Sequence, residues 1–190
     1  WFPSEGYANL YAIVVLAALL SDEFIPRMMG AKGMSFRRDR GSFLVIYIAS
    51  LAGFVAGLFL RYSNIGVVPF WVQALALVLL LAGTVLREWA IILLGRFFSR
   101  TVQVEAGQSL VTSGPFRWIR HPAYTGMLIM DTAIVLGLGT WVGALAMFVI
   151  LLLAALYRIR VEERALLDAF GDEYRSYMQR TALLFPTWRL

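Results

Sequence analysis

Residues 42–60 read SFLVIYIASLAGFVAGLFL, a stretch of nineteen residues without one charged side chain. About 20 apolar residues in a helix cross the hydrocarbon core of a bilayer. Lipid offers the backbone no outside hydrogen-bonding partner, so an uninterrupted helix is the structure that this stretch predicts. Ser42–Leu60 is therefore expected to span a membrane, and it sets the fold class for the rest of the chain.

Four further apolar blocks of similar length accompany this stretch. The chain is 60% hydrophobic and 15% charged, whereas a soluble domain is about half apolar and about a quarter charged. The sequence thus predicts a single all-α integral membrane domain, residues 1–190, with about five transmembrane helices. The first block has no basic flank and no small-x-small cleavage site, so we expect a retained span and not a signal peptide. The four blocks are Tyr7–Ile25, Pro69–Leu94, Pro122–Leu138 and Thr140–Tyr157.

Basic residues gather in alternate polar segments. The second connection holds only Arg61 and the fourth holds none. Because cytoplasmic segments carry the excess of Lys and Arg, five spans place the rich segments in the cytoplasm and the N-terminus outside. Topology therefore explains the net charge of +5 without nucleic acid, for which the chain has no binding motif. The rich segments contain Arg27, Lys32, Arg37, Arg38 and Arg40; Arg96, Arg100, Arg117 and Arg120; and Arg158, Arg160, Arg164, Arg175, Arg180 and Arg189.

The chain has no cysteine and one histidine. This composition excludes disulfides and thiolate metal sites, and it excludes a metal site built from several histidines. We therefore expect no metal.

The end of the chain departs from the apolar pattern. Val161–Phe170 is amphipathic, Gly171 is a natural helix stop, and Asp172 is placed to cap a short helix through Tyr177. We expect these C-terminal amphipathic helices to lie at the membrane surface. The domain then divides into three N-terminal spans, residues 1–96, and a region with a tight helical hairpin and surface helices, residues 97–190.

The densest run of polar and special residues is TSGPFRWIRHPAYTG, residues 112–126. Pro122 favours the first turn of a helix and disfavours helical geometry at His121, so a helix is expected to start there. The free amides of a helix start can bind an anion, with Arg120 and His121 beside them. An ordinary interfacial anchor with the same residue types is the alternative interpretation.

Arg158 and Glu162 are four residues apart and share one helix face. On spacing alone, a snorkelling arginine with a surface ion pair is the favoured interpretation. Arg87, Glu88 and Asp131 are ionisable groups within or near apolar blocks. We expect structural pairing for them, with Arg87 bonded to Asp131 of the neighbouring helix.

In order along the chain, these residues form a known combination. Over about residues 97–185 the chain resembles the isoprenylcysteine carboxyl methyltransferase family, and related phospholipid methyltransferases share much of the pattern. Its length resembles a compact prokaryotic member. The motifs that carry the resemblance are Gly114-Pro115-Phe116, then Arg120 through Gly126, then Arg158 with Glu162-Glu163, and then Gly171-Asp172-Glu173-Tyr174 with Tyr177.

The resemblance implies S-adenosylmethionine as methyl donor and S-adenosylhomocysteine as product, in a pocket at the cytoplasmic face without a Rossmann fold. Arg158 matches the position that holds the substrate carboxylate, and Arg158 and Glu162 are the implied catalytic residues. Phe116 stands where a tyrosine is common, and Gln108 stands where eukaryotic members often have histidine. The positions that match cofactor contacts are Gln103, Gln108, Ser109, Leu110, Val111, Phe116, His121, Pro122, Tyr124 and Glu162.

Apart from the resemblance, the chemistry of carboxylate methylation is compatible with this set of residues. A carboxylate with a reference pKa of about 4 is already ionised at neutral pH, so its methylation requires neither a general base nor a metal. The site must supply positioning, which Arg158 can give through two parallel hydrogen bonds. The donor arrives from the cytoplasm, and a prenylcysteine-like acceptor with a free carboxylate arrives within the membrane lipid.

Other functions remain open on the sequence. A phospholipid or other lipid methyltransferase would have to deprotonate an amine acceptor, so a carboxylate or base would be expected near it. A transporter or structural membrane protein would place charges at mid-membrane depth in both halves of the chain. A membrane reductase with a nicotinamide cofactor is a more remote alternative.

Overall fold

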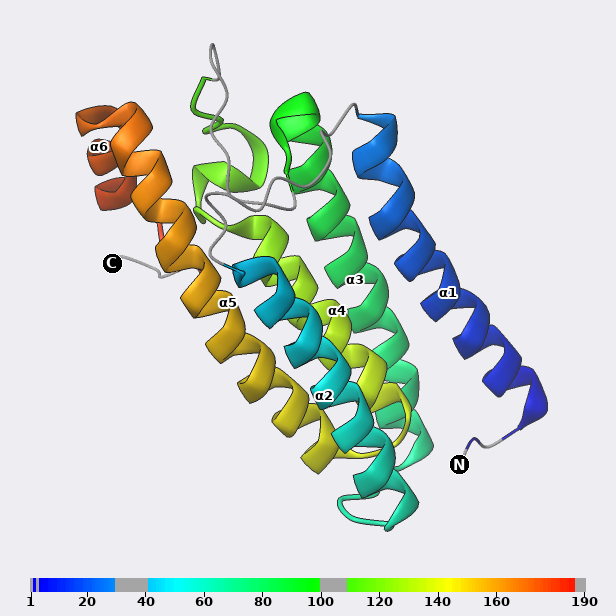
Figure 1. Ribbon diagram of the computed structural model, residues 1–190. Helices are drawn as coiled ribbons and strands as arrows, with labels where there is room; N and C mark the ends of the chain where they lie inside the picture. The colour runs from blue at the N-terminus through cyan, green and yellow to red at the C-terminus, as the bar shows by residue number, and fades with distance from the viewer. Residues whose placement is uncertain (1, 3, 30–40, 100–108, 187–190) are drawn as a thin grey trace.

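The protein, seen in a computed structural model, is described at residues 2, 4–29, 41–99 and 109–186. Its long helices run side by side in one bundle (Figure 1). The expected all-helical membrane bundle is confirmed in this part of the chain. The helices are α1 (Glu5–Met28), α2 (Ser42–Tyr62), α3 (Phe70–Leu94), α4 (Pro122–Gly137), α5 (Trp141–Phe170) and α6 (Asp172–Arg180), with two short 3₁₀ helices, η1 (Gly95–Phe97) and η2 (Gly114–Arg117).

Successive long helices alternate in direction. The C-terminal ends of α1, α3 and α5 and the N-terminal ends of α2 and α4 lie at the same end of the bundle (Figure 1). In the same view, α2 and α4 begin below the level at which α3 and α5 end. The first turns of α2 and α4 are therefore flanked by the longer neighbouring helices.

Four helices, α1, α2, α3 and α5, are long and apolar enough to cross a membrane, and α4 is a shorter apolar helix. The 16 residues of α4 extend about 24 Å at the helical rise, short of the roughly 30 Å of the hydrocarbon core. Eleven residues of α4 are buried, against three in α1. Because its neighbours enclose α4, protein rather than lipid covers most of its length, and it does not need the full length of a span.

Two glycines allow α3 and α4 to touch backbone to backbone. A Cβ on Gly83 would lie 2.7 Å from the backbone nitrogen of Met130, and one on Gly126 would lie 2.7 Å from the backbone nitrogen of Arg87. Small residues at helix interfaces are the usual means of close packing in membranes. The pair therefore fixes the height of Arg87 against the first turns of α4.

We expect Gly126→Ala to destabilise the protein by about 1–3 kcal/mol, because the added methyl group overpacks this contact. The measurement is the Tm of the purified protein in detergent. Gly6→Ala is the matched control, because a Cβ at Gly6 meets no atom closer than 4.0 Å. A Tm for Gly126→Ala at or above that of the unmodified protein would contradict the close contact.

Helices α2 and α5 pack in the same way. A Cβ on Gly143 would lie 3.0 Å from the Cα of Gly57, and a Cβ on Gly53 would collide with Met147. Apolar side chains of α2, α4 and α5 also form one buried cluster that includes Met127, Leu128 and Leu151. This packing holds the first turn of α2 beside the upper half of α5.

Two details at the C-terminal end differ from the sequence expectation. Val161–Phe170 is not a separate surface helix, because α5 runs without a break from Trp141 to Phe170. Asp172 is not a side-chain cap: Gly171 occupies the cap position, and Asp172 instead pairs with Arg175. The charged residues after Tyr157 continue the helix beyond its apolar part, and Gly171, with φ of 53°, ends it as expected.

Candidate active site

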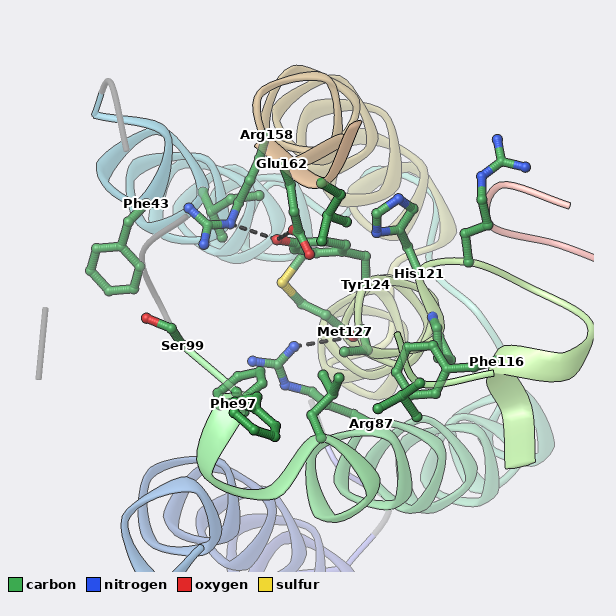
Figure 2. A pocket seen from close by; sticks show the side chains of 18 of the residues that line it. Phe43, Arg87, Phe97, Ser99, Phe116, His121, Tyr124, Met127, Arg158 and Glu162 are labelled. Carbon is green, nitrogen blue, oxygen red and sulfur yellow. Dashed lines mark hydrogen bonds between the residues drawn. The ribbon is translucent and has the colours of Figure 1, made fainter. Parts of the chain in front are cut away.

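A cavity of about 410 Å³ is lined by the N-terminal parts of α2 and α4. All five long helices contribute to its wall, together with residues 97–99 and 109–111. Figure 2 shows Arg158 and Glu162 on one side, Arg87 on the opposite side, and Tyr124 and Met127 between them. The volume lies in the range of about 300–1,000 Å³ typical of small-molecule sites.

The structure brings most of the predicted site residues together around this one cavity. Gln103 and Gln108 lie outside the described residues. The predicted residues that line the cavity are Ser109, Leu110, Val111, Phe116, His121, Pro122, Tyr124, Arg158 and Glu162.

A short hydrogen-bond chain links three of them. The Tyr124 hydroxyl donates to Glu162 Oε2 at 2.7 Å and accepts from Arg158 Nε at 2.7 Å. Arg158 and Glu162 are one turn apart on α5, so both reach Tyr124 of α4 from the same helix face. The tyrosine thereby fixes the orientation of a cation and an anion at the cavity wall.

Ser42 supports Arg158 from the other side. Arg158 Nη1 donates to Ser42 Oγ at 2.9 Å, and both residues are buried. Ser42 is the first residue of α2, so the start of that helix positions the guanidinium. The first two spans carry no recognisable motif, so this contact could not be predicted from the sequence.

Arg120 and His121 converge on Glu163 rather than on a free surface. Arg120 Nε lies 2.9 Å from Glu163 Oε1, and His121 Nε2 lies 3.4 Å from the same oxygen. Tyr174 of α6 donates to this oxygen as well, at 3.5 Å. Glu163 therefore ties the start of α4 to α5 and α6.

The residues after α6 close against the segment that precedes α4. The Arg120 amide donates to the Ala182 carbonyl at 2.8 Å, and the Ala182 amide donates to the Trp118 carbonyl at 3.0 Å. The Thr125 hydroxyl donates to the Leu184 carbonyl. The C-terminal tail thus holds His121 and the first turn of α4 in place.

Phe116 is held in the cavity wall by α6. The Tyr177 hydroxyl donates to the Phe116 carbonyl at 2.7 Å. Burial raises the pKa of Tyr177 to about 12, so the hydroxyl keeps the proton that it donates at physiological pH.

We expect Tyr177→Phe to cost about 1–3 kcal/mol of stability, because the buried Phe116 carbonyl loses its donor. The Tm in detergent measures the loss, and Tyr62→Phe, at an exposed tyrosine, is the control. Equal Tm values for the two variants would show that the bond does not stabilise the site.

The helix start at Pro122 offers less to an anion than the sequence suggested. Helix α4 does begin at Pro122, with His121 at the cap position. However, proline has no N–H, and the Tyr124 amide donates to the His121 carbonyl at 3.1 Å. Binding of an anion at this end of the cavity therefore depends mainly on side chains and not on backbone amides.

Arg87 has a different partner from the one expected. Its guanidinium bonds to both carboxylate oxygens of Asp22 on α1, and Nη1 donates to the Ala123 carbonyl at 3.1 Å. Asp131 instead accepts from Ser50 of α2 at 3.0 Å. Asp22 and Ser50, like Arg87 and Asp131, line the cavity. Asp22 could have been found in the sequence as an ionisable residue near the end of an apolar block.

The arrangement suits a ligand with both charged and apolar parts. Polar side chains line the cavity on two sides, at Arg158, Tyr124 and Glu162 and at Arg87 and Asp22, and apolar or aromatic side chains such as Phe116 and Met127 line much of the remainder. The described residues contain no cluster of three or more side chains able to hold a metal ion. The groups present can therefore bind and orient charged ligands of either sign.

Comparison with known families gives one match. The family model described as "Isoprenylcysteine carboxyl methyltransferase (ICMT) family" matches residues 74–168, half of the chain. The matched range covers most of α3, all of α4 and most of α5, and it leaves out α1 and α2.

Individual relatives agree with this match. The chain is 34% identical over 113 residues to protein-S-isoprenylcysteine O-methyltransferase B of Arabidopsis thaliana, covering 58% of this chain and 57% of that one. It is 34% identical over 116 residues to the protein-S-isoprenylcysteine O-methyltransferase of Schizosaccharomyces pombe, covering 60% of this chain and 49% of that one. The matches thus span about half of the length of these relatives.

A solved structure is similar as well. The eukaryotic intramembrane Ras methyltransferase ICMT superposes with a TM-score of 0.58 at 28% identity, covering 74% of this chain and 51% of that chain. The share of this chain that superposes is larger than the half that the family model matches.

Proposed function

Because the chain belongs to the isoprenylcysteine carboxyl methyltransferase family, we propose that it is an S-adenosylmethionine-dependent carboxyl O-methyltransferase. Its acceptor is the C-terminal carboxylate of an isoprenylated cysteine or a similar lipid-linked carboxylate. The observation that carries this proposal is the chain of bonds from Arg158 through Tyr124 to Glu162 at the wall of one cavity. It supplies a cation for the acceptor and an anion for the donor, side by side.

The donor side of the cavity is formed by residues from three parts of the chain. Glu162 can accept hydrogen bonds from an amino or hydroxyl group, and Phe116 and Tyr124 offer aromatic faces, which attract cationic centres. When bound, S-adenosylmethionine supplies an electrophilic methyl group on a cationic sulfur. The residues proposed to hold it are Ser109, Leu110, Val111, Phe116, His121, Pro122, Tyr124 and Glu162, with Gln103 and Gln108 kept as predictions.

Arg158 is proposed to orient the acceptor. Its Nε is held by Tyr124 and its Nη1 by Ser42, which fixes the plane of the guanidinium. A carboxylate is ionised at neutral pH, so no residue has to remove a proton. The contribution of this chain to the rate is therefore orientation of the acceptor and exclusion of water.

The location of the cavity supports access from the cytoplasm and from the lipid bilayer. It lies at the end of the bundle where the basic residues Arg96, Arg117 and Arg120 gather, which we propose to be the cytoplasmic end, with the N-terminus outside. Leu19 of α1 and Tyr47 of α2 line the cavity and are exposed to the surroundings of the bundle. A lipid chain within the bilayer can reach the cavity along this side.

A methyl-transfer assay in membranes tests the proposal. Membranes containing the protein receive S-adenosylmethionine with a radiolabelled methyl group and either a farnesylated cysteine derivative or phosphatidylethanolamine. The expected product is labelled on the farnesylated acceptor and releases its label in alkali, as an ester does. Transfer to neither acceptor would refute the proposal.

A lipid-amine methyltransferase is the second candidate. Asp22 and Asp131 line the cavity in addition to Glu162, and carboxylates suit a cationic or amine headgroup. Alkali-stable label on phosphatidylethanolamine, without label on the farnesylated acceptor, would favour this candidate.

A further inference from the structure

Among the described residues, three arginines line the cavity; Arg120 is paired with Glu163, and the other two guanidinium groups face each other across it. Arg158 enters it from α5 and Arg87 from α3, on opposite sides in Figure 2. Either cation can bind a carboxylate through parallel hydrogen bonds. If the acceptor is a carboxylate, as proposed above, other groups in the site must determine which of these arginines binds it.

Arg87 already carries a carboxylate of the protein. Its Nε bonds to Asp22 Oδ1 and its Nη2 to Asp22 Oδ2 at 3.2 Å, the two-pronged geometry in which arginine binds carboxylates most specifically. The remaining nitrogen, Nη1, donates to the Ala123 carbonyl at 3.1 Å. All three nitrogens of this guanidinium are thus engaged by protein acceptors.

The surroundings keep this pair in place. The side chains of Arg87 and Asp22 are 12% and 24% exposed, so water screens their attraction only in part. The contact between Gly126 and the backbone of Arg87 fixes the base of the arginine side chain. The carboxylate of a ligand could therefore replace Asp22 on Arg87 only by breaking this partly shielded ion pair.

We infer that Asp22 is a specificity-determining residue of this site. It occupies Arg87 with a carboxylate from α1 and repels a second anion there, so the acceptor carboxylate is directed to Arg158. Asp22 lies outside the range that the family model matches. The first helix, in which the sequence shows no motif, then contributes to the choice of binding mode and not only to the membrane anchor.

A purely structural ion pair between α1 and α3 would behave differently. Its loss would loosen the cavity for charged and neutral ligands alike. Loss of an anion-repelling group instead strengthens the binding of anions and leaves neutral ligands unaffected. The ratio of affinities for an acid and its neutral ester separates these two cases.

The experiment measures equilibrium binding of farnesylthioacetic acid and of its methyl ester to the purified full chain in lipid nanodiscs. For Asp22→Asn we expect the acid-to-ester affinity ratio to rise about tenfold, because a like charge beside the ligand is removed. Asp22→Glu, which keeps the charge, should retain the original ratio. An unchanged or lowered ratio in Asp22→Asn would overturn the inference.

Two further variants complete the design. Glu23→Gln removes a neighbouring acid that also lines the cavity but pairs with Arg27, and we expect it to leave the ratio unchanged. The double variant Asp22→Asn with Arg87→Gln avoids an unpaired buried arginine, which protects the test against misfolding. It should return the ratio to its original value, and a ratio that stays raised would show that Arg87 is not the group controlled by Asp22.

This inference rests on the proposed function for the nature of its acceptor, yet the two can fail separately. The affinity ratio requires no methyl transfer, so it can be measured in a protein without activity. An active protein whose ratio does not respond to Asp22→Asn contradicts the inference alone. A protein that transfers no methyl group to any acceptor contradicts the proposed function.

Discussion

Arg158→Ala is expected to lower methyl transfer to a farnesylated carboxylate by about a hundredfold or more, since a loss of orientation of about 1 Å already costs that much. The guanidinium is fixed by Tyr124 and Ser42, and an alanine leaves neither a cation nor a replacement for these bonds. Binding of the methyl donor should change little, because the donor side of the cavity is formed by other residues. Rates of transfer and calorimetric titration with S-adenosylmethionine measure the two effects separately.

Two controls accompany this variant. Arg160→Ala removes an exposed arginine two residues along the same helix and should leave transfer unchanged. Arg158→Lys keeps the charge in the cavity but loses the fork of donors, so its rate of transfer should stay low. Full activity in Arg158→Lys would show that charge alone, and not oriented bonding, is required.

Glu162→Gln is expected to weaken binding of S-adenosylmethionine about tenfold or more, as hydrogen bonds to charged groups contribute about 1.5–3 kcal/mol. The glutamine preserves the size of the side chain and an oxygen that can accept from Tyr124. The loss should therefore report the missing charge rather than a rearranged cavity. Calorimetric titration of the donor measures it.

Asp168→Asn is the matched control, because Asp168 is an exposed acid on the same helix. We expect this variant to bind the donor as the unmodified protein does. Donor affinity unchanged in Glu162→Gln would remove Glu162 from the donor side of the cavity. Donor affinity lowered in both variants would show a general effect of charge on α5.

The helices themselves could be predicted because lipid leaves so few alternatives. A stretch such as Ser42–Leu60 has to form a helix, and the pair His121-Pro122 marks where α4 begins. The resemblance then identified Tyr124, Arg158 and Glu162, which the structure brings together at one cavity. These predictions depended on local sequence, which is available before any packing is known.

The contacts between distant helices could not be predicted in this way. Arg87 bonds to Asp22 and not to Asp131, and this choice depends on which helices lie side by side and at what height. The close approach at Gly83 and Gly126 sets that height for α3 and α4. Similarly, Ser42 reaches Arg158 only because α2 begins level with the last apolar turns of α5.

The predicted end of α5 was wrong, and the reason is again physical. The change from apolar to charged residues after Tyr157 suggested the end of one helix and the start of another. The structure shows that this change in composition does not end the helix, since the backbone continues to Phe170. Arg158 and Glu162 therefore lie on one rigid helix at the boundary, where both can face the cavity.

A crystal structure with S-adenosylhomocysteine and a farnesylated cysteine derivative bound together tests the shared cavity most directly. We predict the adenosyl group beside Phe116 and Tyr124, and the acceptor carboxylate in hydrogen-bond contact with Arg158. Either ligand bound outside this cavity, or a carboxylate held away from Arg158, would contradict the arrangement proposed for donor and acceptor.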